Sequence, residues 1–173
     1  MKWAKPKLLT WLLLTVGTFA KCQSRKKVIV VGNKEYTMNA THKNLSKIAK
    51  NPFFTQFTKE QLKWLDAHTE EFAVDQNEEI PLEDNVYWIL LYGAWEAQAD
   101  KGPKKAARST DESGKWFGKI DFLRANPDVR LIAKRDSYVL RVSVAVMEQM
   151  QQLGYPVREQ LAAGISEHRA NFQ

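Results

Sequence analysis

Val86 to Trp95 reads V-Y-W-I-L-L-Y-G-A-W, an uncharged run of ten residues in the middle of the chain. A membrane-spanning helix needs about twenty such residues, so this run is expected in a protein core. Its apolar residues recur at the spacing of one helical face, at Val86, Ile89, Leu90, Gly93, Ala94 and Ala97. Aromatic and leucine side chains fill the other faces, so such a helix must be covered on every side. We therefore predict a central helix from about Asp84 to Asp100.

The flanking segments predict the neighbours of this helix in a mainly α-helical bundle. Thr58 and Gln61 have the spacing of a capping box, which opens a helix that extends to about Asp75. Apolar spacing and stop signals predict further helices over residues 42–50, 116–125 and 155–170.

Two segments carry a strand signal. Residues 27–38 join a β-branched run to a Gly32-Asn33 turn, which predicts a short N-terminal β-hairpin. Residues 129–153 fit both the alternation of a strand and the spacing of a helix. We predict one or two helices across 128–153, because the segment ends in helix formers followed by a glycine.

The 173 residues suffice for one domain and a leader. We predict a leader at 1–20, a basic segment with the hairpin at 21–40, and a single helical domain at 41–173. A polar stretch at 101–115 is predicted to be a loop within that domain.

Residues 1–20 have the plan of a secretory signal peptide, because three lysines precede a thirteen-residue apolar run. Cleavage after Ala20 would export the chain to the periplasm or the medium. Two alternatives stay open. Cys22 is a candidate for lipid attachment, although Lys21 stands where that signal has a small residue, and an uncleaved leader would anchor residues 1–27 in a membrane.

Charge is divided along the chain, whose net charge is +6. Residues 1–50 hold 11 basic and 1 acidic residue, residues 51–100 hold 2 and 11, and residues 101–173 hold 13 and 8. The division fits either an interaction surface or attraction between the basic ends and the acidic middle.

Catalytic motifs are missing from the sequence, and no pattern predicts a cofactor or a metal. Glu96 is the candidate catalytic residue. In the predicted helix it follows Trp88, Tyr92 and Trp95, and aromatic walls would favour the protonated form that the general acid of a cell-wall glycosidase needs. The alternative is that Glu96 marks where the helix emerges into water.

The leader, the helical body and the divided charge together favour an exported, non-enzymatic protein of accessory, inhibitor or immunity type. Its partner is predicted to be a protein of the cell envelope or extracellular space. The residues predicted to meet that partner are Asp66, Glu70, Glu71, Asp75, Lys104, Lys105 and Arg108. Nucleic acid is the alternative partner, because K-W-F-G-K at 115–119 interleaves basic and aromatic residues, but an export leader argues against it.

Overall fold

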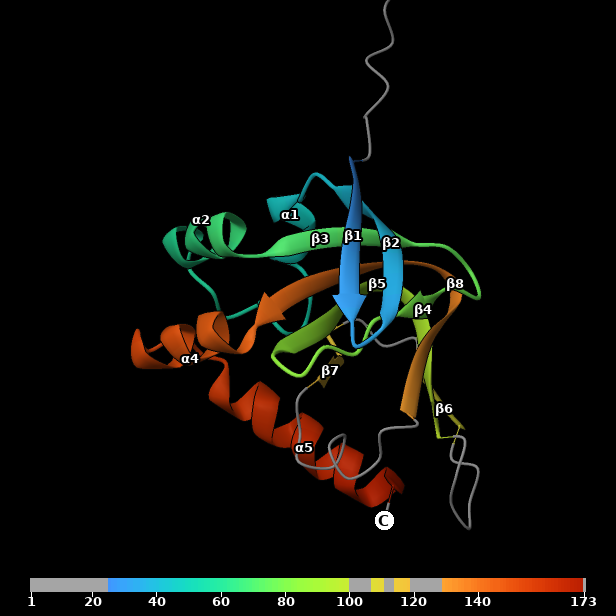
Figure 1. Ribbon diagram of the computed structural model, residues 1–173. Coiled ribbons are helices and arrows are strands. Elements are labelled where there is room, and N and C mark those ends of the chain that lie inside the picture. The colour runs from blue at the N-terminus through green and yellow to red at the C-terminus, as the bar shows by residue number, and fades with distance from the viewer. Residues whose placement is uncertain (1–24, 100–106, 111–113, 119–128, 173) are drawn as a thin grey trace, which may run out of the picture.

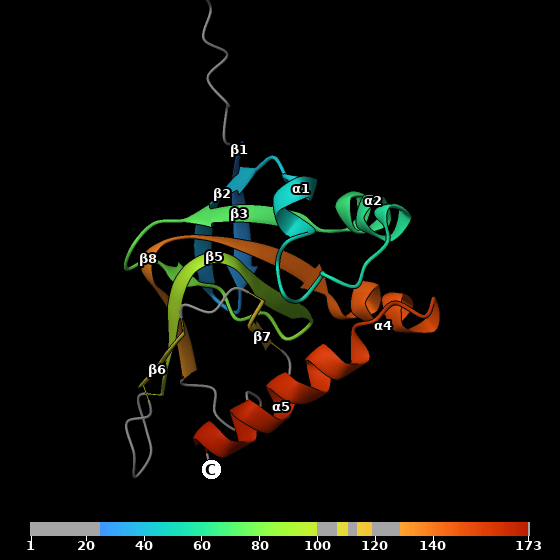
Figure 2. The ribbon, with the colours of Figure 1, turned by 180° about the vertical axis from the view of Figure 1, so that it is seen from behind.

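The computed structural model describes residues 25–99, 107–110, 114–118 and 129–172, which form a curved β-roll with helices along one side (Figure 1, Figure 2). The predicted α-helical bundle is wrong, because the central apolar run and most of the segment after residue 128 are paired strands of one sheet.

The described parts of the chain contain both strands and helices. The strands are β1 (Arg25–Val31), β2 (Lys34–Thr41), β3 (Glu70–Val74), β4 (Glu79–Ile80), β5 (Val86–Ala99), β6 (Ala107–Thr110), β7 (Trp116–Gly118) and β8 (Val129–Ser143). The helices are α1 (Leu45–Ile48), α2 (Lys59–His68), α4 (Val144–Gln152) and α5 (Arg158–Phe172).

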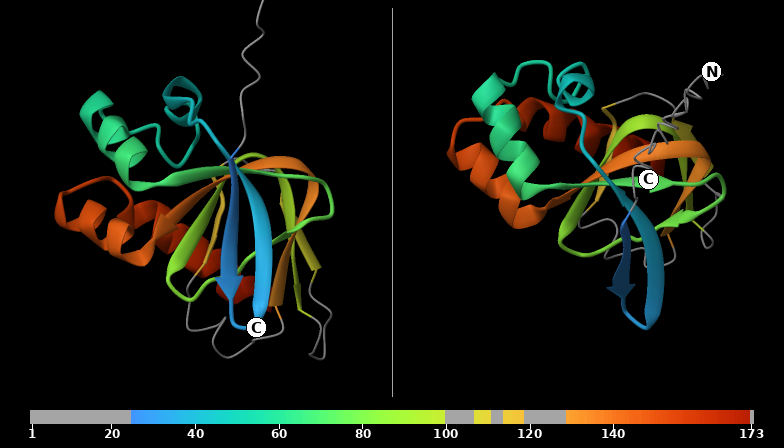
Figure 3. Two further views of the ribbon diagram at one scale, coloured as in Figure 1. Left: turned by 45° about the horizontal axis from the view of Figure 1, so that its top comes forward. Right: turned by 90° about the horizontal axis from the view of Figure 1, so that it is seen from above.

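The sheet is antiparallel and follows the order β1-β2-β3-β8-β5-β6, with β4 paired to β8 and β7 paired to β5. β5 and β8 form its spine and pair from Val86 and Ser143 to Ala99 and Val129. Their register shifts several times around Gly93, which has a φ of +111°. The ribbon bends there, and its two halves curl around a shared interior (Figure 3).

β5 has an apolar sequence without alternation because both of its faces are covered in its first half. Trp88 and Leu90 point into the roll, whereas Ile89 belongs to a second cluster beneath the helices. A strand buried on both faces has a continuous apolar sequence, which here resembles a buried helix. Beyond the bulge at Gly93 the inward position changes parity, so that Trp95 lies inside the roll.

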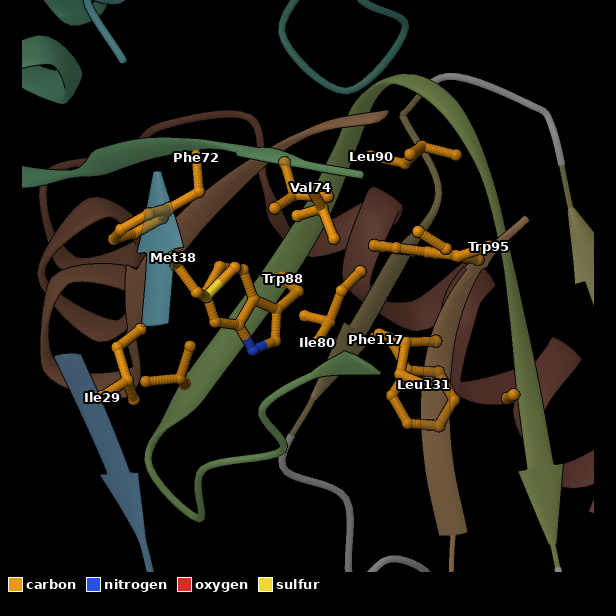
Figure 4. Close-up of a cluster of buried hydrophobic side chains, with 14 of the residues drawn as sticks. Ile29, Met38, Phe72, Val74, Ile80, Trp88, Leu90, Trp95, Phe117 and Leu131 are labelled. Carbon is orange, nitrogen blue, oxygen red and sulfur yellow. The ribbon is translucent and has the colours of Figure 1, made fainter. Parts of the chain in front are cut away.

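The interior of the roll is filled by side chains from most of the strands. In Figure 4, Trp88 lies at the centre, with Phe72 beside it and Phe117 farther along. The Trp88 and Phe72 rings meet edge to face, with centroids 5.8 Å apart, and the indole Nε1 of Trp88 donates to the Pro81 carbonyl oxygen at 2.7 Å. The interior is therefore apolar, and the buried indole N–H has its acceptor.

A second apolar cluster joins the outer face of the sheet to the helices. Phe54 packs edge to face against Phe57, and Leu140 comes from β8. Met147 of α4 and Leu161 of α5 complete the contact. This cluster joins α1, α2, α4 and α5 to one side of the roll, as the views in Figure 3 show.

The other failed helix predictions have a common cause. Glu70–Val74, predicted to belong to a helix, form β3, and the segment 116–125 begins as β7 while its remainder lies outside the described residues. Of the segment predicted at 128–153, Val129–Ser143 form β8 and Val144–Gln152 form α4, where the hydroxyl of Ser143 accepts from the Val146 amide at 3.2 Å. In each segment the apolar residues pair across the sheet, and that pairing outweighs local helix propensity.

Two predictions based on local signals are confirmed. The hairpin predicted at 27–38 is present as β1 and β2 joined at Gly32. The capping box at Thr58 is also present, because its hydroxyl accepts from the Gln61 amide at 3.2 Å and the Gln61 side chain accepts from the Thr58 amide at 2.9 Å. That helix, however, ends at His68.

The remaining helices differ from expectation in extent. α1 is only one turn long, and the Asn44 side chain caps it by accepting from the Lys47 amide at 3.2 Å. The predicted last helix is confirmed as α5, on which Leu161 is buried and Ala162 is exposed.

The leader predicted at 1–20 and most of the polar loop predicted at 101–115 lie outside the described residues. Within the described ranges, no helix has the length and apolar character that a membrane crossing requires.

Candidate functional site

The first candidate region is the β7–α5 seam, formed by Trp116 and Gly118 of β7 with Gln160 and Gly164 of α5. The indole Nε1 of Trp116 donates to the Gln160 carbonyl oxygen at 3.0 Å. The same indole meets the Tyr87 ring edge to face, with centroids 5.4 Å apart. Trp116 is therefore held between the sheet on one side and α5 on the other.

Two glycines allow this close packing. A Cβ at Gly164 would overlap the Trp116 indole and lie 2.8 Å from its Cζ2 atom. A Cβ at Gly118 would overlap the Val86 carbonyl oxygen and lie 2.8 Å from the Cα of Tyr87. Glycine at both positions brings the helix, the indole and the strand into direct contact.

The second candidate region is an open hollow of about 660 Å³ on the outside of the roll, between α1, β3 and the bend of β5. We call it the outer hollow. The residues that line it are Thr41, His42, Asn44, Lys47, Ile48, Lys50, Asn51, Glu71, Leu91, Tyr92 and Tyr138.

The outer hollow contains a buried carboxyl. Glu71 is 8% exposed, and its Oε1 accepts from the Thr41 hydroxyl at 2.8 Å. Burial raises the pKa of Glu71, while the Thr41 hydrogen bond and the positive charges of Lys43 and Lys47 act in the opposite direction. The negative charge of Glu71 is thus offset by groups on α1 and in the segment that leads into it.

Glu96 lies on β5, not at the exit of a helix. Its carboxylate accepts from the Gln98 side chain, and the Lys134 ammonium lies 3.6 Å from Glu96 Oε2. The helical geometry that grouped Glu96 with Trp88 and Tyr92 is absent, because Trp88 is inside the roll and Tyr92 is exposed on the outside. A catalytic role for Glu96 stays a prediction.

The acidic residues predicted on one helix are separated. Asp66 is on α2 and pairs with Lys43, while Glu70 on β3 pairs with Lys27 and Arg141. Glu71 faces the outer hollow, and Asp75 lies in the exposed turn after β3, where its amide donates to Glu78 at 3.1 Å. Several of these carboxylates are thus neutralised within the molecule.

The other predicted site residues give less information. Lys104, Lys105 and Cys22 lie outside the described residues, and the backbone of Arg108 in β6 pairs with that of Ala97 in β5. In the described ranges, no cluster of three or more His, Cys, Asp or Glu side chains is arranged to hold a metal ion. The roles predicted for these residues in partner binding and lipid attachment stay predictions.

The sequence did not predict the contacts that the aromatic residues of both regions make. Trp116 was visible in K-W-F-G-K, but only as a possible nucleic-acid contact, and Gly164 carries no local turn signal. Tyr92 and Tyr138 are cross-strand partners in the bend, although 46 residues separate them in the printed sequence. Only the strand register brings such pairs together.

No protein-family model and no curated protein matches the chain. Solved structures with the same fold do match. A cyclic nucleotide-binding domain from Methylobacillus flagellatus KT has a TM-score of 0.53 and 17% identity, over 73% of this chain and 76% of that one. The sensor domain of the transcriptional regulator DNR from Pseudomonas aeruginosa has a TM-score of 0.53 and 17% identity, over 72% and 92%. A Geobacter metallireducens GS-15 protein, described as cyclic nucleotide-binding, has a TM-score of 0.53 and 21% identity, over 76% and 99%.

These likenesses show the fold of the chain. They overturn the predicted function, because an accessory, inhibitor or immunity protein with a helical body is not what the chain folds into. One basis of that prediction was a helical body around a helix predicted from about Asp84 to Asp100, and most of that segment is β5 (Val86–Ala99), a strand of the roll.

Proposed function

We propose that the chain is a regulatory domain that binds a small anionic ligand of the cyclic-nucleotide class and signals its occupancy through α5. The structural neighbours support the ligand class, because two of the three described above are named for cyclic nucleotide binding and the third is a sensor domain. Fold alone does not determine function, so the proposal also needs support from the chain's own residues.

The observation that carries the proposal is the β7–α5 seam. Trp116 touches the sheet through Tyr87 and touches α5 through Gln160 and Gly164. Packed elements of this kind change arrangement in discrete steps, so a ligand that shifts β7 would also shift the helix. The seam therefore supplies a mechanical link between a ligand-binding roll and a C-terminal helix.

Calorimetric titration of the full chain with cyclic AMP and cyclic GMP tests ligand binding. We expect saturable binding of one nucleotide per chain, and weaker binding of linear AMP, which lacks the cyclic phosphate. Absence of heat with both cyclic nucleotides up to about 1 mM, where binding energies fall to roughly 4 kcal/mol, would contradict the proposal.

Tryptophan fluorescence tests the role of the seam. Trp116→Phe removes the donor to Gln160 and keeps an aromatic ring, whereas Trp64→Phe changes an indole on α2 that stacks on His68, with ring centroids 4.0 Å apart. The nucleotide-induced fluorescence change should disappear in Trp116→Phe and persist in Trp64→Phe. The reverse result would place the ligand response elsewhere.

The compartment in which such a domain would work depends on the leader. Intact-mass measurement of the chain purified from its natural host separates a chain that begins at Lys21, a lipidated Cys22 and an intact Met1. We propose export on the basis of the apolar run at 1–20, and the mass expected is that of the chain from Lys21. An intact Met1 in a soluble extract would contradict export. The ligand proposal is tested separately, by the calorimetric titration.

A further inference from the structure

The outer hollow contains an aromatic platform that the proposed function does not use. Tyr92 on β5 and Tyr138 on β8 are directly paired across the strands, and they are 61% and 42% exposed. Large apolar side chains at a paired position usually face a core, but these two face the open hollow. Leu91 and Ile48 add apolar surface beside them.

The platform is held in place by fixed backbone contacts. The Ser137 hydroxyl accepts from the Ala94 amide at 3.1 Å, which ties the strands together beside the two tyrosines. On the facing side, the Asn51 side chain donates to the Leu90 carbonyl oxygen at 3.0 Å and accepts from the Phe53 amide at 3.0 Å. The gap between the end of α1 and β5 is therefore set by buried hydrogen bonds, and the hollow is formed before any ligand arrives.

Positive charge surrounds this platform. Lys47 and Lys50 are exposed residues that line the hollow, and within the described parts of the chain neither forms an ion pair at contact distance. The Arg135 guanidinium lies 5.8 Å from the Tyr92 ring centroid and donates to the Gly93 carbonyl oxygen at 2.9 Å. Glu71 is the acidic residue that lines the hollow, and Thr41 already donates to it.

We propose that the outer hollow binds a planar aromatic ring that carries an anionic group. The ring stacks on Tyr92 and Tyr138, and the anion faces Lys47 and Lys50. A volume of about 660 Å³ suits a small organic molecule, and an apolar lining with a few charged groups is typical of such sites. The residues that line this site do not include those of the β7–α5 seam, and the proposal does not depend on the cyclic nucleotide that we propose as the ligand of the roll.

Anilinonaphthalene sulfonate is a suitable probe, because it combines a flat aromatic system with one negative charge and fluoresces when its surroundings are apolar. Titrated against the full chain, it should bind saturably with one molecule per chain. Uncharged N-phenylnaphthylamine, which has the same rings, should bind more weakly. Equal binding of the two probes would overturn the anionic part of the proposal.

Variants in the hollow locate the probe. Tyr92→Ala should weaken binding about 5- to 100-fold, the range for losing one stacked aromatic surface, and Tyr138→Ala should act in the same direction. The double variant Lys47→Gln, Lys50→Gln should weaken binding several-fold at low salt and much less at high salt. All these side chains are exposed or border solvent, so the fold should persist, which circular dichroism checks.

Matched controls are available on other surfaces. Leu153→Ala removes an apolar side chain that is 53% exposed, and Lys63→Gln removes an exposed lysine on α2. Both controls should bind the probe as the unaltered chain does. If they weaken binding as much as the hollow variants, or if the tyrosine variants leave binding unchanged, the hollow is not the site.

Discussion

The β7–α5 seam and the outer hollow are both built from aromatic side chains, but those aromatics make different contacts. Trp116 is buried between a strand and a helix, whereas Tyr92 and Tyr138 are exposed on the bend of the sheet. An aromatic between two elements couples their positions, and an aromatic on a single rigid surface offers only a binding face. We therefore propose that the seam transmits the effect of a ligand, whereas the hollow binds a ligand without signalling.

The largest expected effect is that of Gly93→Ala, at the bend that carries Tyr92. A Cβ there would overlap the Ser137 side chain and lie 2.6 Å from its Cα, and the φ of +111° disfavours any side chain. We expect a loss of about 3 kcal/mol or more in the free energy of unfolding, measured by urea denaturation.

Gly32→Ala is the control for Gly93→Ala. Gly32 has a φ of +59°, and nothing lies within 4 Å of a Cβ at that position. Gly32→Ala should therefore lower the free energy of unfolding by about 1 kcal/mol, the cost of a side chain at a positive φ without a steric clash. Equal losses in the two variants would show that the close approach of Gly93 to Ser137 contributes nothing to the bend.

The next effect concerns the seam. In an exposed helix, replacing glycine by alanine stabilises by roughly 1 kcal/mol, but at Gly164 the new methyl group would meet the Trp116 indole. We expect Gly164→Ala to destabilise the protein by about 1–2 kcal/mol and to shift the Trp116 emission.

Ala163→Gly is the matched change on the exposed side of the same helix. It should cost about 1 kcal/mol through helix propensity and leave the Trp116 emission as it was. Stabilisation by Gly164→Ala with unaltered emission would mean that α5 does not rest on Trp116.

The smallest effect concerns Glu71, in the outer hollow. Burial raises the pKa of this carboxyl above the ordinary value of 4.5, so the folded state binds the proton more tightly than the unfolded state does. The free energy of unfolding should therefore fall as the pH rises from about 4.5 through the raised pKa. Glu71→Gln keeps an oxygen to accept from Thr41 and removes this loss, so it should stabilise the chain at neutral pH and have little effect below about pH 4.5.

Thermal unfolding across the pH range measures this difference. Glu35→Gln, which removes an exposed carboxylate on β2, serves as the control. A stabilisation by Glu71→Gln that is largest in acid would contradict the sign of the pKa shift.

The sequence predicted the parts of the fold that depend on neighbouring residues. The Gly32 turn and the Thr58 capping box are local, and both are present. The segment 129–153 has both the alternation of a strand and a run of helix formers. In the structure its first part is the strand β8 and its second part is the helix α4, with the boundary at Ser143. What failed was the prediction of helix for the whole segment, because its first part is the strand β8.

The central run shows why the fold class could not be read from spacing. Trp88 and Ile89 are adjacent and both fully buried, because the roll covers one face of β5 and the helices cover the other. Such a run satisfies the helical pattern as well as the strand pattern. The decisive facts are the pairing of β5 with β8 and the bend at Gly93, and both depend on residues far away in the chain.

The same limit applied to the candidate sites. Glu96 was predicted to be catalytic because it follows an apolar run with aromatic side chains. In the structure its carboxylate lies beside the Lys134 ammonium on the sheet. Residues that meet only through strand register or helix docking, as Trp116 meets Gly164, have no signature in a single sequence.

Hydrogen exchange along α5 tests most directly whether the seam signals and the hollow does not. Exchange at Arg158–Phe172 is compared for the free chain, for the chain saturated with the cyclic nucleotide that calorimetry selects, and for the chain saturated with anilinonaphthalene sulfonate. We expect the nucleotide to change exchange in α5, and the sulfonate to change it only around α1 and the bend of β5. Unchanged exchange in α5 at saturating nucleotide, or an equal change with the sulfonate, would contradict the account.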